Sequence, residues 1–150
     1  MGRRAKNQRA TALWAGIVFC CCALGCSSKP SDHLAVHPVQ GKVLFDGKPI
    51  AGALVVLHPQ DAGPAQAVRP VAYTKDDGSF AVATYDAGDG APSGKYVATV
   101  EWLVRPKGTE DEQIVVPNKL PQRYGNPQSS RLAVEVIAGA NDLPPFQLTR

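Results

Sequence analysis

The chain has 150 residues, 16 basic and 13 acidic side chains, a formal net charge of +3 and four cysteines. Four of the basic residues lie in the first nine positions, so the rest carries twelve basic against thirteen acidic side chains and offers no basic face for nucleic acid. The 125 residues that follow residue 25 are enough for one domain with a hydrophobic core, whereas two domains would be crowded.

The N-terminal segment has the order of an export signal. Residues 1–9 are positively charged without any acid, and residues 10–25 form an apolar run. This run is shorter than the roughly 20 apolar residues that a membrane span needs. We therefore expect residues 1–25 to be a signal peptide that is removed on export, with a plain secretory signal or an uncleaved N-terminal anchor as the alternatives.

The end of this run, Ala23-Leu24-Gly25-Cys26, resembles the lipobox of bacterial lipoproteins, in which small residues precede a cysteine that becomes the new N-terminus. The family usually has Leu where this chain has Ala23. The resemblance implies that the thiol of Cys26 takes a diacylglycerol and that its amine takes a third, palmitate-type chain. Each buried methylene contributes about 0.8 kcal/mol, and stable anchoring takes two or more chains. Ser27 favours the outer over the inner membrane, so the prediction is an extracytoplasmic, membrane-anchored lipoprotein.

The cysteines restrict the chemistry of the mature chain. Residues 20–22 are cysteines that leave with the signal, and Cys26 carries the lipid, so the folded part has none. This excludes a disulfide, a thiol nucleophile and a zinc site with cysteine ligands from the domain, which must be held by its core.

The mature chain begins with a polar, proline-bounded tether at residues 26–38, and a domain is expected over residues 39–150. Residues 39–45 alternate, with Val39, Val43 and Phe45 on one face, and end at Asp46-Gly47, a strong signal for a tight hairpin turn. The return strand at residues 52–59 is apolar on both faces, which is typical of the middle of a sheet.

Short alternating segments and turns continue to the end of the chain. Residues 105–130 form a long loop, with an acidic stretch and one expected helical turn near residues 122–124; loops of this length usually either serve a function or are mobile. About seven short strands without helical spacing predict an all-β, antiparallel β-sandwich of the transthyretin-like or Ig-like type. The remaining strands are expected at residues 71–74, 80–85, 95–104, 131–137 and 146–149.

The segments VQGKVLFDGKPIAGALVVLHP, TKDDGSF, SGKYVATV, LPQRYGNP and RLAVEVIAGAND resemble the carboxypeptidase regulatory-like domain, a transthyretin-like (prealbumin-type) β-sandwich common in bacterial lipoproteins. The resemblance covers residues 39–149 and rests on turn and core residues, which specify fold rather than activity. It implies a non-catalytic module that stabilises, positions or binds protein or polysaccharide. Hydroxyisourate hydrolases share this fold but end in Tyr-Arg-Gly-Ser, whereas this chain ends in PPFQLTR, so their activity is not carried over.

Two loops concentrate carboxylates and could hold calcium. Asp76 and Asp77 lie in the first, and Asp86 and Asp89 lie in the second. Asp and Gly also occupy such turns for backbone reasons, and neither loop has the EF-hand spacing. Calcium binding is therefore kept as an alternative, and no metal or other cofactor is predicted.

Catalytic groups are sparse in the mature sequence. His33 and His37 have helical zinc spacing but lie in the tether, and His58 at the end of a strand is unassigned. The serines at positions 79, 129 and 130 lie outside any Gly-x-Ser-x-Gly motif, and no Ser/His/Asp arrangement is evident. The sequence predicts a protein that is not an enzyme.

Four aromatic residues could form a sugar-binding platform: Tyr85, Tyr96, Trp102 and Tyr124. Trp102 is expected in the core, and the two loop tyrosines, Tyr85 and Tyr124, are the better candidates. The leading prediction is a lipid-anchored structural or protein-binding module of the cell envelope, and a carbohydrate-binding or enzyme-accessory lipoprotein is the alternative. The sequence names neither the partner nor the oligomeric state.

Overall fold

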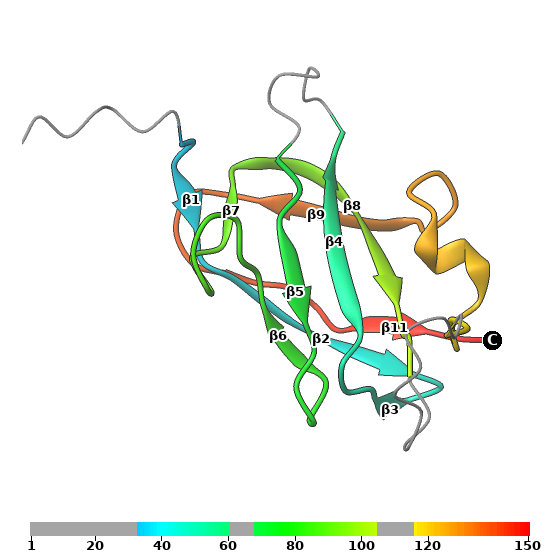
Figure 1. Cartoon of the computed structure of the whole chain (residues 1–150). Coiled ribbons are helices and arrows are strands. Elements are labelled where there is room, and N and C mark those ends of the chain that lie inside the picture. Colours follow the sequence, from blue (N-terminus) through cyan, green and yellow to red (C-terminus); the bar gives the residue numbers. More distant parts are fainter. Residues whose placement is uncertain (1–32, 61–67, 105–115) are drawn as a thin grey trace, which may run out of the picture. The chain divides into compact units, whose positions relative to one another are not determined.

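The computed structural model describes residues 33–60, 68–104 and 116–150. The predicted signal peptide, Cys26 and most of the predicted tether therefore lie outside the described residues. Residues 33–150 form one compact unit of short strands, shown in Figure 1. Within the described part these elements are β1 (Val36–His37), β2 (Val39–Phe45), β3 (Lys48–Pro49), β4 (Leu54–Pro59), β5 (Val71–Tyr73), β6 (Ser79–Ala81), β7 (Ala91–Pro92), β8 (Gly94–Glu101), the 3-10 helix η2 (Gln122–Gly125), β9 (Leu132–Val136), β10 (Asn141–Asp142) and β11 (Phe146–Leu148).

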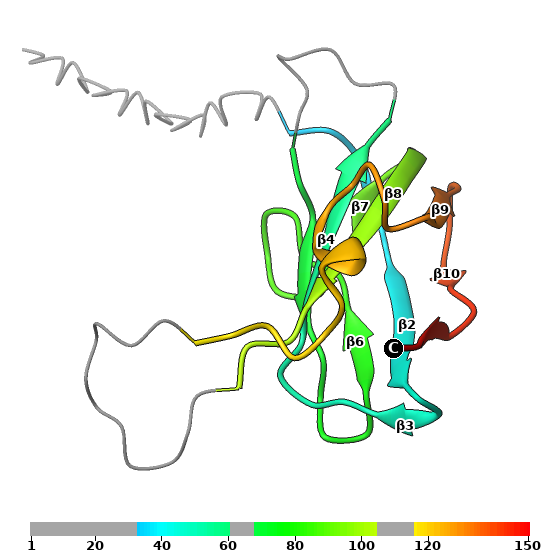
Figure 2. The same cartoon turned by 90° about the vertical axis from the view of Figure 1, so that its right-hand side faces the viewer.

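Two main sheets make up the unit. The first is antiparallel with the order β5-β4-β8-β9. The second is built on β2, which β3 and β6 join antiparallel and β10 and β11 join parallel, and β1 and β7 form a separate two-stranded ribbon. Figure 2 shows β4 and β8 in one layer and β2 in another. The predicted all-β sandwich is confirmed, although the described chain has more strands than seven and its last two strands pair parallel with β2.

The predicted hairpin turn forms at Asp46-Gly47. Their φ angles are 49° and 76°, the left-handed values that a tight primed turn requires. The return strand is only β3, because Pro49 offers no N–H for a longer ladder. The chain then crosses over, and residues 52–59 contribute β4 to the other sheet, between β5 and β8. The prediction that β4 lies in the middle of a sheet is confirmed, but its expected pairing with residues 39–45 is wrong.

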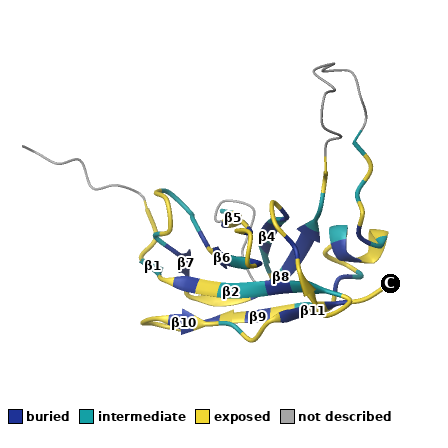
Figure 3. Cartoon of the chain, turned by 90° about the horizontal axis from the view of Figure 1, so that it is seen from below, coloured by how far each residue is buried: buried dark blue, intermediate teal, exposed yellow. Residues whose placement is uncertain are grey.

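The core lies between the two sheets and follows the alternation of the strands (Figure 3). Along β8, for example, Tyr96, Ala98 and Val100 are buried. Burying one large aliphatic or aromatic side chain contributes roughly 1.5–3 kcal/mol, so this apolar layer is the main support of the fold. The other large buried side chains are Val39, Val43, Ile50, Val55, Leu57, Phe80, Val82, Leu120, Tyr124, Val134, Val136, Phe146 and Leu148.

Candidate functional site

Residues 33–38, which the sequence assigns to the tether, lie on the sandwich; we call them the stem. Strand β1 pairs antiparallel with β7, with Val36 opposite Pro92. The His33 ring stacks on the Tyr85 ring at a centroid distance of 3.9 Å and an angle of 6°. The Leu34 N–H also donates to the Tyr85 hydroxyl at 3.1 Å. These contacts hold the stem on the folded unit.

The second stem histidine contacts a different loop. The Gly139 N–H donates to Nδ1 of His37 at 3.2 Å, which joins the stem to the turn that follows β9. His33 and His37 thus have separate partners, Tyr85 and Gly139. Over the described residues, no three His, Cys, Asp or Glu side chains gather as a group that could hold a metal ion.

One carboxylate in each of the two acidic loops, Asp77 in the first and Asp89 in the second, accepts hydrogen bonds from backbone N–H groups. Asp77 accepts from the N–H and the hydroxyl of Ser79, at 3.0 and 2.6 Å, and these bonds lower its pKa. Asp89 accepts from the N–H groups of Thr84, Tyr85 and Asp86 at 2.7 to 3.0 Å. Burial alone would raise the pKa of Asp89, but these donors outweigh it and lower the pKa. Both carboxylates therefore support their own turns, and these turns flank opposite ends of β6.

His58 lies on β4 within the first sheet. Its Nε2 lies 2.9 Å from the hydroxyl oxygen of Thr99 on the neighbouring β8. Burial, together with the positive charge of Arg69, lowers the pKa of His58. The neutral ring that this favours is part of a contact between two strands of one sheet.

The three serines weighed as nucleophiles donate to nearby acceptors instead. Ser79 donates to Asp77, and Ser129 donates to the Arg123 carbonyl at 2.9 Å. Ser130 is buried and donates to the carbonyl of Ala98 on β8. These hydroxyl groups hold turns and the edge of the sheet.

The four expected platform aromatics do not come together. Tyr96 is buried and donates to the Pro92 carbonyl at 2.7 Å, and burial raises its pKa. Tyr85 is covered on one side by His33. Tyr73, which the sequence analysis passed over, is the tyrosine that projects into solvent, with 67 % of its surface exposed. Its alternation with the buried Ala72 on β5 was the available signal.

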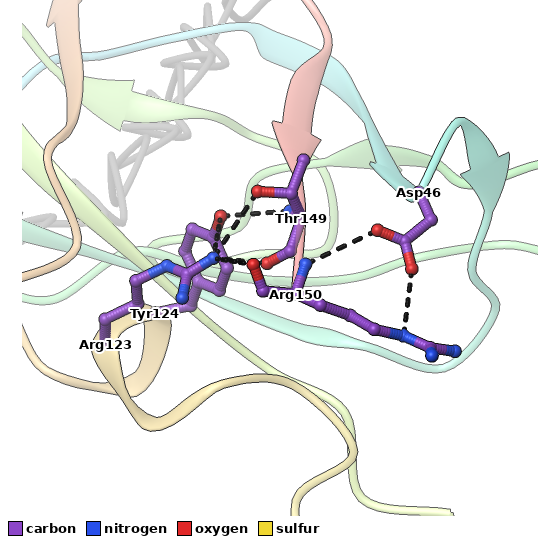
Figure 4. A network of polar contacts seen from close by, with 5 residues as sticks. All are labelled: Asp46, Arg123, Tyr124, Thr149 and Arg150. Carbon is purple, nitrogen blue, oxygen red and sulfur yellow. Dashed lines mark hydrogen bonds and ion pairs between the residues drawn. The ribbon is translucent and has the colours of Figure 1, made fainter.

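Tyr124 is also buried, which makes its expected role in sugar stacking wrong. It lies in η2, where its hydroxyl accepts from the N–H of Thr149 at 3.0 Å and from Arg123 at 3.3 Å (Figure 4). Burial would raise the pKa of Tyr124, but these donors and the Arg123 charge lower it. Arg123 also donates to the carbonyls of Thr149 and Arg150, so this network ties η2 to the end of β11.

Trp102 lies at the rim of the core rather than inside it. Its indole N–H donates to the Ala51 carbonyl at 3.0 Å, and Phe45 packs edge-on against its ring at 6.4 Å between centroids. The Lys119 ammonium lies 5.3 Å from the centre of the indole ring. Trp102 is therefore held in one orientation while remaining only partly buried.

Trp102 forms part of an open groove, which we call the Trp102 groove. Leu103 and Val104 follow Trp102 along the chain and are exposed. Arg150 carries an ion pair to Asp46 at 3.2 Å. The groove beside Trp102 is a mainly apolar hollow of about 560 Å³ with two cationic side chains, Lys119 and Arg150, in its lining. Its lining consists of Phe45, Trp102, Lys119, Leu120, Pro121 and Arg150.

The chain was compared with known proteins. No protein-family model matches it, and no curated protein matches it either. Within the described residues, no helix has the length and apolar character needed to cross a bilayer.

Proposed function

We propose that this protein is an extracytoplasmic lipoprotein, anchored through Cys26, whose β-sandwich is a non-enzymatic module that binds another protein of the cell envelope. The observation that carries the proposal is the position of Cys26. It follows a charged and then apolar leader, and only six residues separate it from His33, where the folded unit begins. A lipid on Cys26 would therefore hold the sandwich close to the membrane surface.

The Trp102 groove supports a binding role. Protein interfaces are enriched in aromatic residues and Arg, and their binding energy concentrates on a few such side chains. Trp102 is already fixed by its hydrogen bond to Ala51 and by Phe45, so little side-chain entropy remains to be lost on binding. With Lys119 and Arg150 at its margin, the groove fits a protein surface that offers apolar and acidic side chains.

The carbohydrate-binding alternative keeps Trp102 as its supporting residue, because Tyr96 and Tyr124 are buried. A sugar stacked on the indole on the Lys119 side would have to displace that cation from the ring. Calcium binding loses support, since the carboxylates of Asp77 and Asp89 are engaged by the backbone. The resemblance to the carboxypeptidase regulatory-like domain remains part of the proposal, and the β-sandwich architecture is compatible with it.

The anchor is tested by Cys26→Ser, with Cys22→Ser as the matched control in the same cysteine-rich run. We expect Cys26→Ser to release the protein from the membrane fraction or to stall it as a precursor, whereas Cys22→Ser leaves attachment and intact mass unchanged. The measurements are membrane fractionation and mass spectrometry of the native protein. An unmodified residue 26 in the membrane-bound protein would refute the anchor.

The binding role is tested by a pair of charge reversals. Lys119→Glu changes the margin of the Trp102 groove, and Lys95→Glu changes another exposed lysine at the opposite end of β8. We expect the affinity for an envelope protein, followed by cross-linking, to fall about tenfold, or 1.4 kcal/mol, in Lys119→Glu only. Equal effects of both variants would contradict a role for the groove. Binding to a polysaccharide in a glycan array, with no protein cross-link, would replace this proposal by the carbohydrate one.

A further inference from the structure

We propose that the apolar turn at residues 137–140, together with Leu34 of the stem, rests on the lipid bilayer. We call this the proximal turn. The inference rests on the proposed lipid anchor and adds an orientation to it, in which the sandwich stands with the Trp102 groove directed away from the membrane.

The proximal turn has the composition and exposure of a membrane-contacting surface. Its sequence, Ile-Ala-Gly-Ala, contains no side chain that is charged or forms hydrogen bonds, and all four residues are exposed. Ile137 exposes 61 % of its surface, and Leu34 in the stem exposes 39 %. Moving exposed apolar side chains from water into the interface of a bilayer lowers the free energy of the system.

The turn is built to hold Ile137 outward. The buried Asn141 accepts from the Ile137 N–H at 2.9 Å, and its amide donates to the Ile137 and Gly139 carbonyls at 3.0 and 2.8 Å. These three bonds close the turn around one side chain. They hold the backbone of the turn in the conformation in which the Ile137 side chain is exposed.

The anchor brings this turn to the membrane. The Gly139 N–H is bonded directly to His37, so the turn lies against the His37 end of the stem. Seven backbone steps separate Cys26 from His33, which limits their separation to roughly 24 Å even in a fully extended chain. A lipid on Cys26 would therefore hold the start of the stem within this distance of the membrane surface.

The register of the strands places the Trp102 groove at the other end. Val136 pairs with Gly94 at the start of β8, and Ile137 follows Val136 directly. Trp102 follows Glu101 at the end of β8, and eight residues of strand span roughly 26 Å. Figure 1 shows the course of β8 away from β7.

The charges around the proximal turn select the kind of lipid surface. Glu135 and Asp142 are exposed on either side of it, and Lys95 is opposite Glu135 in the sheet. Two acidic groups against one basic group disfavour a strongly anionic surface. The contact is therefore expected with zwitterionic lipid.

The test uses the purified, lipid-modified protein in phosphatidylcholine vesicles that contain brominated acyl chains, which quench nearby tryptophan. Of the two tryptophans in the sequence, Trp14 lies in the signal, so Trp102 alone reports from the mature chain. In a Trp102→Phe background, Ile137→Trp is expected to lose about half of its emission, because interfacial apolar groups lie 5–10 Å deep.

A matched variant places a tryptophan at the end of the sandwich that carries the Trp102 groove. Tyr73→Trp, in the same background, replaces a side chain that is 67 % exposed. Tyr73 and Glu101 both pair with Leu54, so Tyr73 lies at the level of the end of β8. We expect no quenching of Tyr73→Trp. We also expect no quenching of Trp102 in the unsubstituted protein, a measurement that does not depend on whether a variant folds.

The outcomes separate this inference from the proposed function. If mass spectrometry shows lipid on Cys26 but Ile137→Trp is not quenched, the membrane contact is refuted and the anchor stands. Quenching of Tyr73→Trp or of Trp102 refutes the orientation. If Cys26 carries no lipid, the proposed function fails, and the contact fails with it.

Discussion

Replacing Gly90 by alanine should detach the stem from the sandwich. Gly90 has a φ of +100°, and a Cβ at this position would lie 1.7 Å from the carbonyl oxygen of His37 and 2.3 Å from its carbonyl carbon. Both are backbone atoms of β1, so no change of rotamer can relieve the overlap. The stem must move away from β7 to accommodate one methyl group.

The expected cost has two parts. Holding alanine at this φ costs about 1–2 kcal/mol. Displacing the stem also removes the β1–β7 pairing and the bonds from Leu34 to Tyr85 and from Gly139 to His37, at about 0.5–1.5 kcal/mol for each hydrogen bond. We therefore expect Gly90→Ala to lower the free energy of unfolding by about 3–5 kcal/mol.

Gly88→Ala is the control, because Gly88 has a similar φ of +75° but no atom within 4 Å of the added Cβ. It should cost only the backbone strain of about 1–2 kcal/mol. Urea unfolding measures both variants, and hydrogen exchange measures the protection of the Leu34 amide. Equal losses in the two variants, or a Leu34 amide that stays protected in Gly90→Ala, would show that this reasoning about the stem is wrong.

Three further substitutions test individual side chains. Asp89→Asn should lower stability by about 1–2 kcal/mol at pH 7, measured by urea unfolding. Because the pKa of Asp89 is lowered, its contribution is present above its ordinary value of 3.8 and is lost as the pH falls, so the difference between the two proteins should shrink below pH 3.8. The lowered pKa of His58 makes its protonation unfavourable in the folded state, so the native protein loses stability as the pH falls below 6.5. His58→Gln should reduce this loss. An unchanged pH profile of unfolding would contradict the reasoning. Tyr124→Phe should lower stability by about 1–3 kcal/mol and deprotect the Thr149 amide in hydrogen exchange, because that N–H loses its acceptor; a protected amide would argue against it.

Features that depend on neighbouring residues were readable from the sequence. Asp46-Gly47 predicted its turn, because only residues that tolerate a positive φ fit there. A strand was expected over residues 95–104, and most of these residues form β8. The single turn of η2 was also expected where it is found.

Features that depend on distant pairing were not readable. Alternation shows which face of a strand is buried but not which strand lies beside it, so the crossover of β4 and the parallel pairing of β11 with β2 were missed. Tyr124 was expected at the surface because its segment reads as a loop, yet its hydroxyl is bound by Thr149, 25 positions away. Trp102 follows the last residue of β8 and so lies at the rim instead of in the core.

The parallel return of β10 and β11 onto β2 has a consequence for the order of folding. Gln40 and Asp142 are partners across the sheet although 102 positions separate them. Such distant partners slow folding, and a strand edge left unpaired attracts other chains. When the polypeptide emerges N-terminus first, one edge of β2 stays unpaired until residues 141–148 have appeared. Closure of the second sheet therefore has to wait for these residues, and a molecule truncated before residue 141 keeps that edge open to other chains.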